Sequence, residues 1–332
     1  MTGPLLRVRD LVVEFGARGK PIARAVDGVD LDVEAREVVA VVGESGSGKT
    51  TLARTILGLE RPTAGSIEFE GKPLPTTVRR LRPFRRRVQL VLQDPTGSLN
   101  PRQTVYESVA EGLRIHRMVT KSDVPENEQV AEALSRAGLR PPENFFLRYP
   151  HELSGGQRQR IVIAGALALG PELLVADEPV SSLDASIRGE ILALLLRLRD
   201  ELGLTVLVIT HDLGLAWNIA DRIAVMYLGR LVEFGTAEQV LSEPRHPYTQ
   251  ALLSVVPEMH HIEPVVLTGE PPDVTRIPSG CRFHPRCPAL LQDGRAEAAA
   301  ITEACRGKPL PVIGTTEGHV AACWLPESQG SR

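Results

Sequence analysis

Long apolar runs are missing from this chain of 332 residues. No uninterrupted run reaches the roughly 20 residues that a transmembrane helix needs, and the run Ile191–Leu196 ends at the charged Arg197. Residues 1–10 lack the charged segment followed by an apolar segment that is typical of a signal peptide. We therefore expect a soluble, cytoplasmic chain that reaches any membrane only through a partner.

Aromatic residues and excess charge are also scarce. Aromatic residues make up 4% of the chain. The net charge is −3, so the composition does not suggest a broad basic surface for nucleic acid. The densest basic run, six arginines between Arg79 and Arg87, has no platform of aromatic residues on which bases could stack. We interpret this run as a solvated face and expect no nucleic-acid partner.

The apolar pattern predicts an α/β fold. Leu5–Phe15 reads as an edge strand followed by a glycine-rich turn, and Val38–Val42 has no polar break, as in a strand covered on both faces of a parallel sheet. Each further candidate strand is followed by polar residues and then a helical pattern; these strands are Val88–Leu92, Leu173–Ala176 and Val206–Ile209. This alternation predicts a mostly parallel core sheet.

Two segments depart from this alternation. Apolar residues at helical spacing between Tyr106 and Ala137 predict a helical insert, placed at about residues 104–165. After Leu253, frequent prolines break any long element. We therefore predict a large domain over residues 1–255 and a small, loop-rich domain over residues 256–332.

A phosphate-binding motif follows the buried strand. Residues 43–50 fit the pattern GxxxxGK[ST] and lie between a predicted strand and a predicted helix. Glycines let successive backbone N–H groups wrap phosphate oxygens at a positive helix N-terminus. We expect Lys49 to reach the β- and γ-phosphates of a nucleotide and Thr50 to ligate Mg²⁺.

Two acidic residues follow the candidate strand that starts at Leu173. Asp177 and Glu178 follow four apolar residues directly. Downstream of a phosphate-binding loop, this pattern predicts that Asp177 holds Mg²⁺ and that Glu178 orients or deprotonates the attacking water.

A second glycine-containing turn precedes a predicted helix from about Arg158 to Ala168. Its sequence, Leu-Ser-Gly-Gly-Gln at residues 153–157, would present N–H groups at a helix start. The chain already has one phosphate-binding loop. We therefore expect this surface to meet the nucleotide of another subunit across a two-fold interface.

Together with Ser181–Asp184 and His211, these motifs resemble, in order, the ATP-binding cassette of ABC transporters. The resemblance covers residues 5–250 and implies a P-loop NTPase cassette with an added antiparallel β subdomain and helical insert. It implies that Gln93 contacts Mg²⁺ or water, that Asp184 lies at the dimer interface, and that His211 contacts the γ-phosphate. The nucleotide-binding residues it implies are Phe15 (stacked on adenine), Gly43, Ser45, Gly46, Ser47, Gly48, Lys49, Thr50, Thr51, Ser154, Gly155, Gly156, Gln157 and Asp184.

Three segments resemble the oligopeptide, dipeptide and nickel importer subfamily: Gln93–Pro95, Gly97–Arg102 and His246–Thr249. The second is closer to the F-type than to the D-type ATPase subunit. The resemblance implies an ATPase that drives peptide import from the cytoplasmic face of the membrane. Its partners would be a D-type ATPase subunit, two permease subunits and an extracellular or periplasmic solute-binding protein.

Other functions remain open at this point. The same subunit could serve nickel or another small solute. A soluble cassette ATPase acting on ribosomes or DNA is a rival, although such proteins usually carry two cassettes or long insertions, which this chain lacks. The third alternative, an exporter subunit, is disfavoured by the His-Pro-Tyr segment and the cysteine-containing tail.

All four cysteines lie after Gly280, at positions 281, 287, 305 and 323. Their spacing, C-x5-C-x17-C-x17-C, lacks the close pairs of structural zinc sites. Four thiolates could still hold one metal centre, and similar tails in the resembled subfamily can carry a [4Fe–4S] cluster. We expect such a cluster on Cys281, Cys287, Cys305 and Cys323, ahead of zinc and of the alternative of four unligated buried cysteines.

Overall fold

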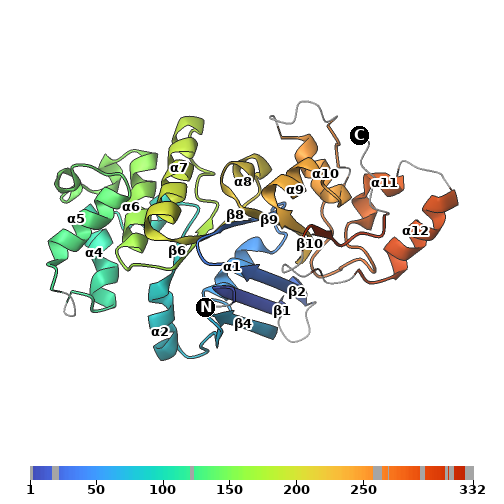
Figure 1. Cartoon of the computed structure of the whole chain (residues 1–332), viewed down its shortest axis with the longest axis horizontal. Coiled ribbons are helices and arrows are strands. Elements are labelled where there is room, and N and C mark those ends of the chain that lie inside the picture. Colours follow the sequence, from blue (N-terminus) through green and yellow to red (C-terminus); the bar gives the residue numbers. More distant parts are fainter. Residues whose placement is uncertain are drawn as a thin grey trace. The chain divides into compact units, whose positions relative to one another are not determined.

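The computed structural model describes residues 3–16, 22–119, 123–256, 264–267, 269–291, 296–310, 313 and 318–325 (Figure 1). By its internal contacts the chain divides into two compact units. The first unit comprises Met1–Glu34, Val39–Leu74 and Thr210–Arg332, and the second comprises Ala35–Val38 and Pro75–Ile209. None of the described helices combines the length and the apolar character needed to cross a membrane.

The first unit contains an antiparallel sheet in the order β2-β1-β4-β5. Strand β1 (Leu6–Phe15) pairs with β2 (Ala23–Val33) on one side and with β4 (Ala64–Phe69) on the other, and β5 (Lys72–Pro73) follows β4. The prediction of an edge strand at β1 was therefore wrong, because both of its hydrogen-bonding edges are used. The turn predicted after β1 falls largely outside the described residues.

The same unit holds the strand that leads into the phosphate-binding motif. All five residues of β3 (Val38–Val42) are buried, as its apolar run predicts. It pairs in parallel with β9 (Arg222–Tyr227), which pairs antiparallel with β10 (Arg230–Thr236). The helices here are α1 (Lys49–Ile56), α8 (Leu213–Ile219), α9 (Ala237–Ser242) and α10 (Pro247–Ser254).

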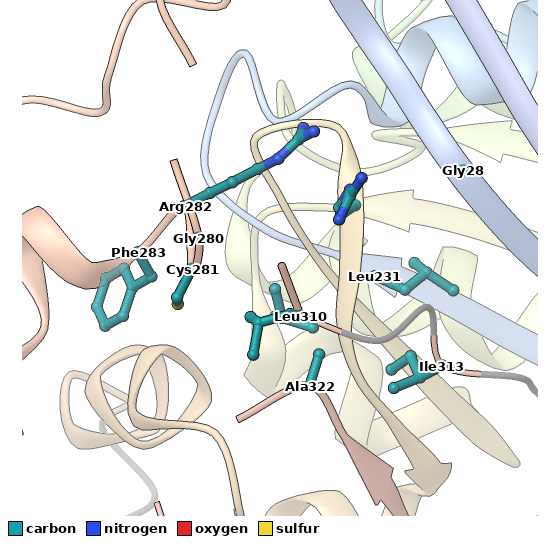
Figure 2. A pocket seen from close by; sticks show the side chains of 11 residues that line it. Gly28, Leu231, Gly280, Cys281, Arg282, Phe283, Leu310, Ile313 and Ala322 are labelled. Atoms are coloured by element: carbon teal, nitrogen blue, oxygen red, sulfur yellow. The ribbon is translucent and has the colours of Figure 1, made fainter. Parts of the chain in front are cut away.

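The C-terminal segment shares its core with the rest of the first unit. Strand β11 (Val320–Ala321) pairs antiparallel with β10, and Phe283 lies in one buried cluster with Tyr227 and Tyr248. Figure 2 shows a small pocket at this packing, with Leu310, Ile313 and Ala322 among its lining side chains. Its helices are the 3-10 helix η3 (His284–Arg286), α11 (Pro288–Leu291) and α12 (Ala296–Gly307). The predicted domain boundary at 255/256 stays a prediction.

The second unit contains the other predicted strands. Strand β7 (Leu173–Asp177) pairs in parallel with β6 (Val88–Val91) and with β8 (Thr205–Thr210). These three strands agree with the predicted ones to within one residue at each end, because each is a short, mostly apolar segment. The adjoining helices are α2 (Val78–Arg87), α3 (Pro95–Ser98) and α7 (Ala185–Leu202).

The predicted helical insert is present in the second unit. Helices α4 (Val105–Ile115) and α5 (Glu126–Arg136) both contact α6 (Gly155–Leu167), and the three lie together in Figure 1. Two 3-10 helices, η1 (Pro142–Phe145) and η2 (Pro150–Glu152), precede α6. Val109, Leu134 and Ile161 belong to their shared apolar core. This core gives α6 a fixed position, and its first turn carries the Leu-Ser-Gly-Gly-Gln motif.

Candidate ATP site

The loop between β3 and α1 has the backbone of a phosphate-binding loop. Gly46 has a φ of 78° and Gly48, the N-cap of α1, has a φ of 105°. A Cβ atom at Gly48 would lie 2.1 Å from the carbonyl oxygen of Ala25, so a side chain there clashes with backbone. In the described part of the chain, no side chain caps α1. The first N–H groups of this helix are thus suited to bind an anion.

The ammonium group of Lys49 lies within this loop. The side chain is 6% exposed, and its Nζ donates hydrogen bonds to the carbonyl oxygens of Gly43 at 2.6 Å and Glu44 at 2.8 Å. The Ser47 hydroxyl accepts a third bond at 3.3 Å. A cation enclosed by glycine-rich backbone is suited to the charge of a polyphosphate. Thr50 is exposed directly after it, and its hydroxyl is the type of oxygen ligand that Mg²⁺ takes.

The other predicted residues of the first unit are accessible. Phe15 ends β1 and is 43% exposed, so its side chain is accessible to a ligand. His211 follows β8, is exposed, and precedes Asp212, whose carboxylate caps α8 by accepting from the N–H of Leu215. Their roles in adenine stacking and γ-phosphate contact stay predictions.

Two carboxylates end β7 in the second unit. Asp177 is 7% exposed, whereas Glu178 is half-buried. Glu178 has a φ of 51°, a left-handed conformation that is uncommon outside glycine. Its N–H donates to the carbonyl oxygen of Ile209 at 2.8 Å, which fixes it against β8. Strained backbone of this kind collects at functional sites, which supports the predicted catalytic role of Glu178.

The Leu-Ser-Gly-Gly-Gln motif forms the first turn of α6 with its own side-chain caps. Ser154 Oγ accepts from the N–H of Gln157 at 3.2 Å, and the Gln157 side chain accepts from the N–H of Ser154 at 3.0 Å. Ser154 and Gly155 are exposed, while Gly156 is buried against Ile187, which a Cβ atom would meet at 2.7 Å. The exposed turn is therefore rigid.

Two further contacts connect predicted residues of the second unit. Gln93 is exposed after β6, and the Ser182 hydroxyl donates to its carbonyl oxygen at 3.5 Å. Arg158, in α6, donates to the hydroxyl of Thr96 at 3.2 Å. Asp184 is the exposed N-cap residue of α7. The Gln93 loop thus contacts both the Ser181–Asp184 segment and the helix of the Leu-Ser-Gly-Gly-Gln motif.

The sequence reasoning missed a set of contacts on Glu44. This residue occupies a variable position of the GxxxxGK pattern, and its side chain forms an ion pair with Arg286 of the C-terminal segment. Its N–H donates to the hydroxyl of Tyr248. The His-Pro-Tyr segment was noted only as a subfamily marker, and no pattern singled out Arg286.

The chain matches two family models, and it has relatives that are similar over nearly its whole length. Residues 26–181 match the ABC transporter family, and residues 232–292 match the C-terminal region of oligopeptide/dipeptide transporters. The oligopeptide transport ATP-binding protein AppF of Bacillus subtilis is 45% identical over 97% of each chain. The chain belongs to the oligopeptide/dipeptide group of ABC transporter ATP-binding proteins. Similar matches are a putative peptide import ATP-binding protein of Brucella ovis, 44% identical over 96% of this chain and 97% of the relative, and the dipeptide transport ATP-binding protein DppF of Haemophilus influenzae, 42% identical over 94% and 92%.

Solved structures agree with this ABC family assignment. CbiO1 from Clostridium perfringens, part of the ABC transporter complex CbiONQ, is 30% identical, with a TM-score of 0.64 over 78% of this chain and 98% of that one. The ATP-binding cassette MJ0796, in a dimeric structure bound to ADP and Pi, is also 30% identical, with a TM-score of 0.61 over 70% and 98%. The predicted cassette fold and ATPase activity of this ABC protein are confirmed.

The four cysteines of this ABC protein all lie in the first unit. Cys281, Cys287 and Cys305 are buried in one apolar cluster, Cys323 is half-buried, and all four are free thiols. Burial, with smaller effects from neighbouring thiols, raises the pKa of Cys281 to about 12 and that of Cys305 to about 11. Among the described residues, no group of three or more His, Cys, Asp or Glu side chains could hold a metal ion. The predicted [4Fe–4S] cluster and the zinc alternative therefore find no support.

Proposed function

We propose that this chain binds and hydrolyses Mg-ATP to power an importer of oligopeptides or dipeptides. The observation that carries the proposal is the enclosed ammonium group of Lys49 beside an α1 N-terminus that begins with Gly48 in a left-handed conformation. This arrangement presents a cation and backbone N–H groups to the same anion. The β- and γ-phosphates are the ligand that fits both.

The other site residues have separate roles in this proposal. Residues 43–51 would bind the phosphates, and Phe15 would stack on adenine. Thr50, Asp177 and Gln93 would supply oxygen atoms to Mg²⁺. Glu178 orients or deprotonates the attacking water, and His211 contacts the γ-phosphate. Hydroxyl, carboxylate and amide oxygens are ligands that Mg²⁺ accepts in proteins, so the chemistry of this donor set fits the ion. The bound ion would neutralise charge that develops on the phosphates.

Hydrolysis requires a second chain. The exposed turn at Ser154–Gln157 would contact the γ-phosphate bound by the partner, with Asp184 at the interface. The self-capped geometry of this turn supports the role, because it is held ready without a ligand. The similar cassette MJ0796 is described as a dimer bound to ADP and Pi.

The second chain is a D-type ATPase subunit, and this chain is the F-type subunit. The Gly97–Arg102 wording supports the F-type assignment, as do the names of the relatives AppF and DppF. The relatives are named for peptide, oligopeptide and dipeptide transport, which supports peptide cargo over nickel.

The remaining partners are two permease subunits and a solute-binding protein. The chain would lie peripherally on the cytoplasmic face of the membrane, with the Gln93 loop and the helical insert receiving a permease helix. ATP drives transport because it has a higher affinity for the closed pair of ATPase subunits than for the open pair.

The test uses the Glu178→Gln variant, which should retain bound ATP. Mixed with its cognate D-type subunit and Mg-ATP, it should form a stable heterodimer in size-exclusion chromatography with light scattering. The Lys49→Ala/Glu178→Gln double variant is the control and should stay monomeric. The proposal would be contradicted if Mg-ATP did not change the oligomeric state of either variant. Co-purification of the chain with ribosomes in place of permeases would also contradict it.

A further inference from the structure

Glu44 is held at three points, although it is a variable position of the motif. Its carboxylate accepts two hydrogen bonds from Arg286, at 2.8 Å from Nη1 and 3.2 Å from Nη2. Its N–H donates to the hydroxyl of Tyr248 at 2.8 Å, and its carbonyl oxygen accepts from Lys49 Nζ at 2.8 Å. The position of Glu44 therefore affects the ammonium group of Lys49, which we expect to bind the phosphates.

Arg286 is itself fixed by its surroundings. It lies in η3 and is 7% exposed, and its Nη1 also lies 3.4 Å from the hydroxyl of Tyr227. The ring of Phe283 packs against both Tyr227 and Tyr248, with centroids 5.2 and 5.3 Å apart. The Arg286 side chain is buried and that of Glu44 is 25% exposed. A two-point arginine–carboxylate pair has a defined geometry that a lysine does not reproduce. The C-terminal segment thus places one cation at one residue of the loop.

The charge of Glu44 makes this pair important for nucleotide binding. A carboxylate within a loop that collects phosphates repels them, and this repulsion is strong where solvent screening is weak. The guanidinium group of Arg286 neutralises the carboxylate. Without it, an anion would remain in the loop beside the carbonyl oxygen that contacts Lys49.

We propose that Arg286 is a positioning residue for ATP, acting through Glu44. It cancels the charge of that carboxylate and fixes the backbone from which Lys49 and the loop N–H groups reach the phosphates. The inference rests on the proposed function, because it requires that residues 43–51 bind ATP. It gives the C-terminal segment a role in the ATPase reaction itself.

The test compares Arg286→Ala with Arg9→Ala in the full-length chain. Arg9 forms a matched two-point pair with Asp32, at 2.7 and 2.6 Å, in the antiparallel sheet. Binding of Mg-ATP is measured by calorimetry, and stability by thermal unfolding. Arg286→Ala should weaken ATP binding about tenfold, which equals about 1.4 kcal/mol. Arg9→Ala should lower the unfolding midpoint and leave the dissociation constant for ATP unchanged.

A second comparison separates charge from structure. In a Glu44→Gln background, Arg286→Ala should change the dissociation constant by less than about threefold, because no carboxylate is left exposed. Arg286→Lys keeps the charge and should restore part of the affinity. In the assembled ATPase pair, Arg286→Ala should raise KM for ATP with little change in kcat.

Each outcome decides between the two proposals. If Lys49→Ala binds ATP as well as the unmodified chain does, the proposed function fails. If Lys49→Ala loses binding but Arg286→Ala keeps it, only the present inference fails. Equal losses for Arg286→Ala in the unmodified chain and in the Glu44→Gln background would also overturn it, since the effect would then be structural. If Arg286→Ala does not fold, Arg286→Lys and Arg286→Gln in the two backgrounds provide the same comparison.

Discussion

Helices α1 and α6 both begin at a glycine-rich turn, but the two turns meet their hydrogen-bonding needs differently. α1 starts at Gly48, and among the described residues no side chain caps it. α6 starts at Ser154, where Ser154 and Gln157 cap each other's N–H groups. The first turn thus has no side-chain cap in the described part of the chain, whereas the second is capped by its own side chains. This difference fits a primary phosphate site in the first unit and a preformed contact surface for another chain in the second.

The largest effect is expected from removing the cation at the start of α1. Lys49→Ala should lower kcat/KM for ATP about a thousandfold, near the upper range for one preorganised charge that stabilises a transition state. ATP binding to the single chain should fall as well, since Lys49 contacts the phosphates before the reaction. Steady-state kinetics and calorimetry with Mg-ATP measure both. A variant with normal affinity and slow turnover would place Lys49 in the chemical step alone.

Backbone conformation provides the next comparison, within the α1 turn. Gly48 has a φ of 105°, and an added Cβ atom would lie 2.1 Å from the Ala25 oxygen. Gly48→Ala should therefore lower the free energy of unfolding by about 3 kcal/mol. Gly46→Ala, the matched control, has a φ of 78° but no described heavy atom within 4 Å of the added Cβ. It should cost about 1 kcal/mol. If urea unfolding gave similar losses of stability for Gly48→Ala and Gly46→Ala, the contact with the Ala25 oxygen would be unimportant.

The self-capped turn should respond differently. Ser154→Ala removes the hydroxyl that caps α6 and should lower ATP hydrolysis by the assembled pair about a hundredfold, the low end for loss of one catalytic hydrogen-bond donor. ATP binding to the single chain should remain, in contrast to Lys49→Ala. Helix stability should fall by about 1 kcal/mol. Ser154→Thr keeps a hydroxyl and is the control. Loss of ATP affinity in the isolated Ser154→Ala chain would remove the distinction between the two turns.

The smallest effect concerns a third kind of helix start, at α10. His246 caps this helix by accepting from the N–H of Tyr248 with a neutral ring nitrogen, and burial lowers the pKa of His246 to about 4 despite the opposing charge of Glu233. Because the folded pKa lies below the unfolded value of about 6.5, the stabilisation is complete above pH 6.5 and is lost as the pH falls toward 4. At pH 5 the loss is about 2 kcal/mol.

The check is the difference in unfolding free energy between the unmodified chain and His246→Asn. Asparagine keeps an acceptor for the helix cap but does not titrate in this range. The two unfolding profiles should converge as the pH falls from 6.5 to 4. Parallel profiles would mean that His246 is not held neutral in the folded chain.

Local patterns determined much of this protein by themselves. The strands β3, β6, β7 and β8, the start of α1 and the positions of the site motifs follow from residues that are close in sequence, because hydrophobic runs and glycine-rich turns act over a few residues. The motifs and their order also resembled those of the ABC family, and the relatives confirm that assignment.

Tertiary structure decided what depends on distant residues. The interior place of β1 results from its pairing with β4, which its own pattern does not specify. The four cysteines gather in one region, yet the described side chains do not form a metal centre, because ligand geometry depends on backbone placement and not on spacing along the chain. Glu44 and Arg286 are 242 residues apart. A single ion pair leaves no periodic signal in a sequence. The contact between the C-terminal segment and the phosphate-binding loop is therefore visible only in the tertiary structure.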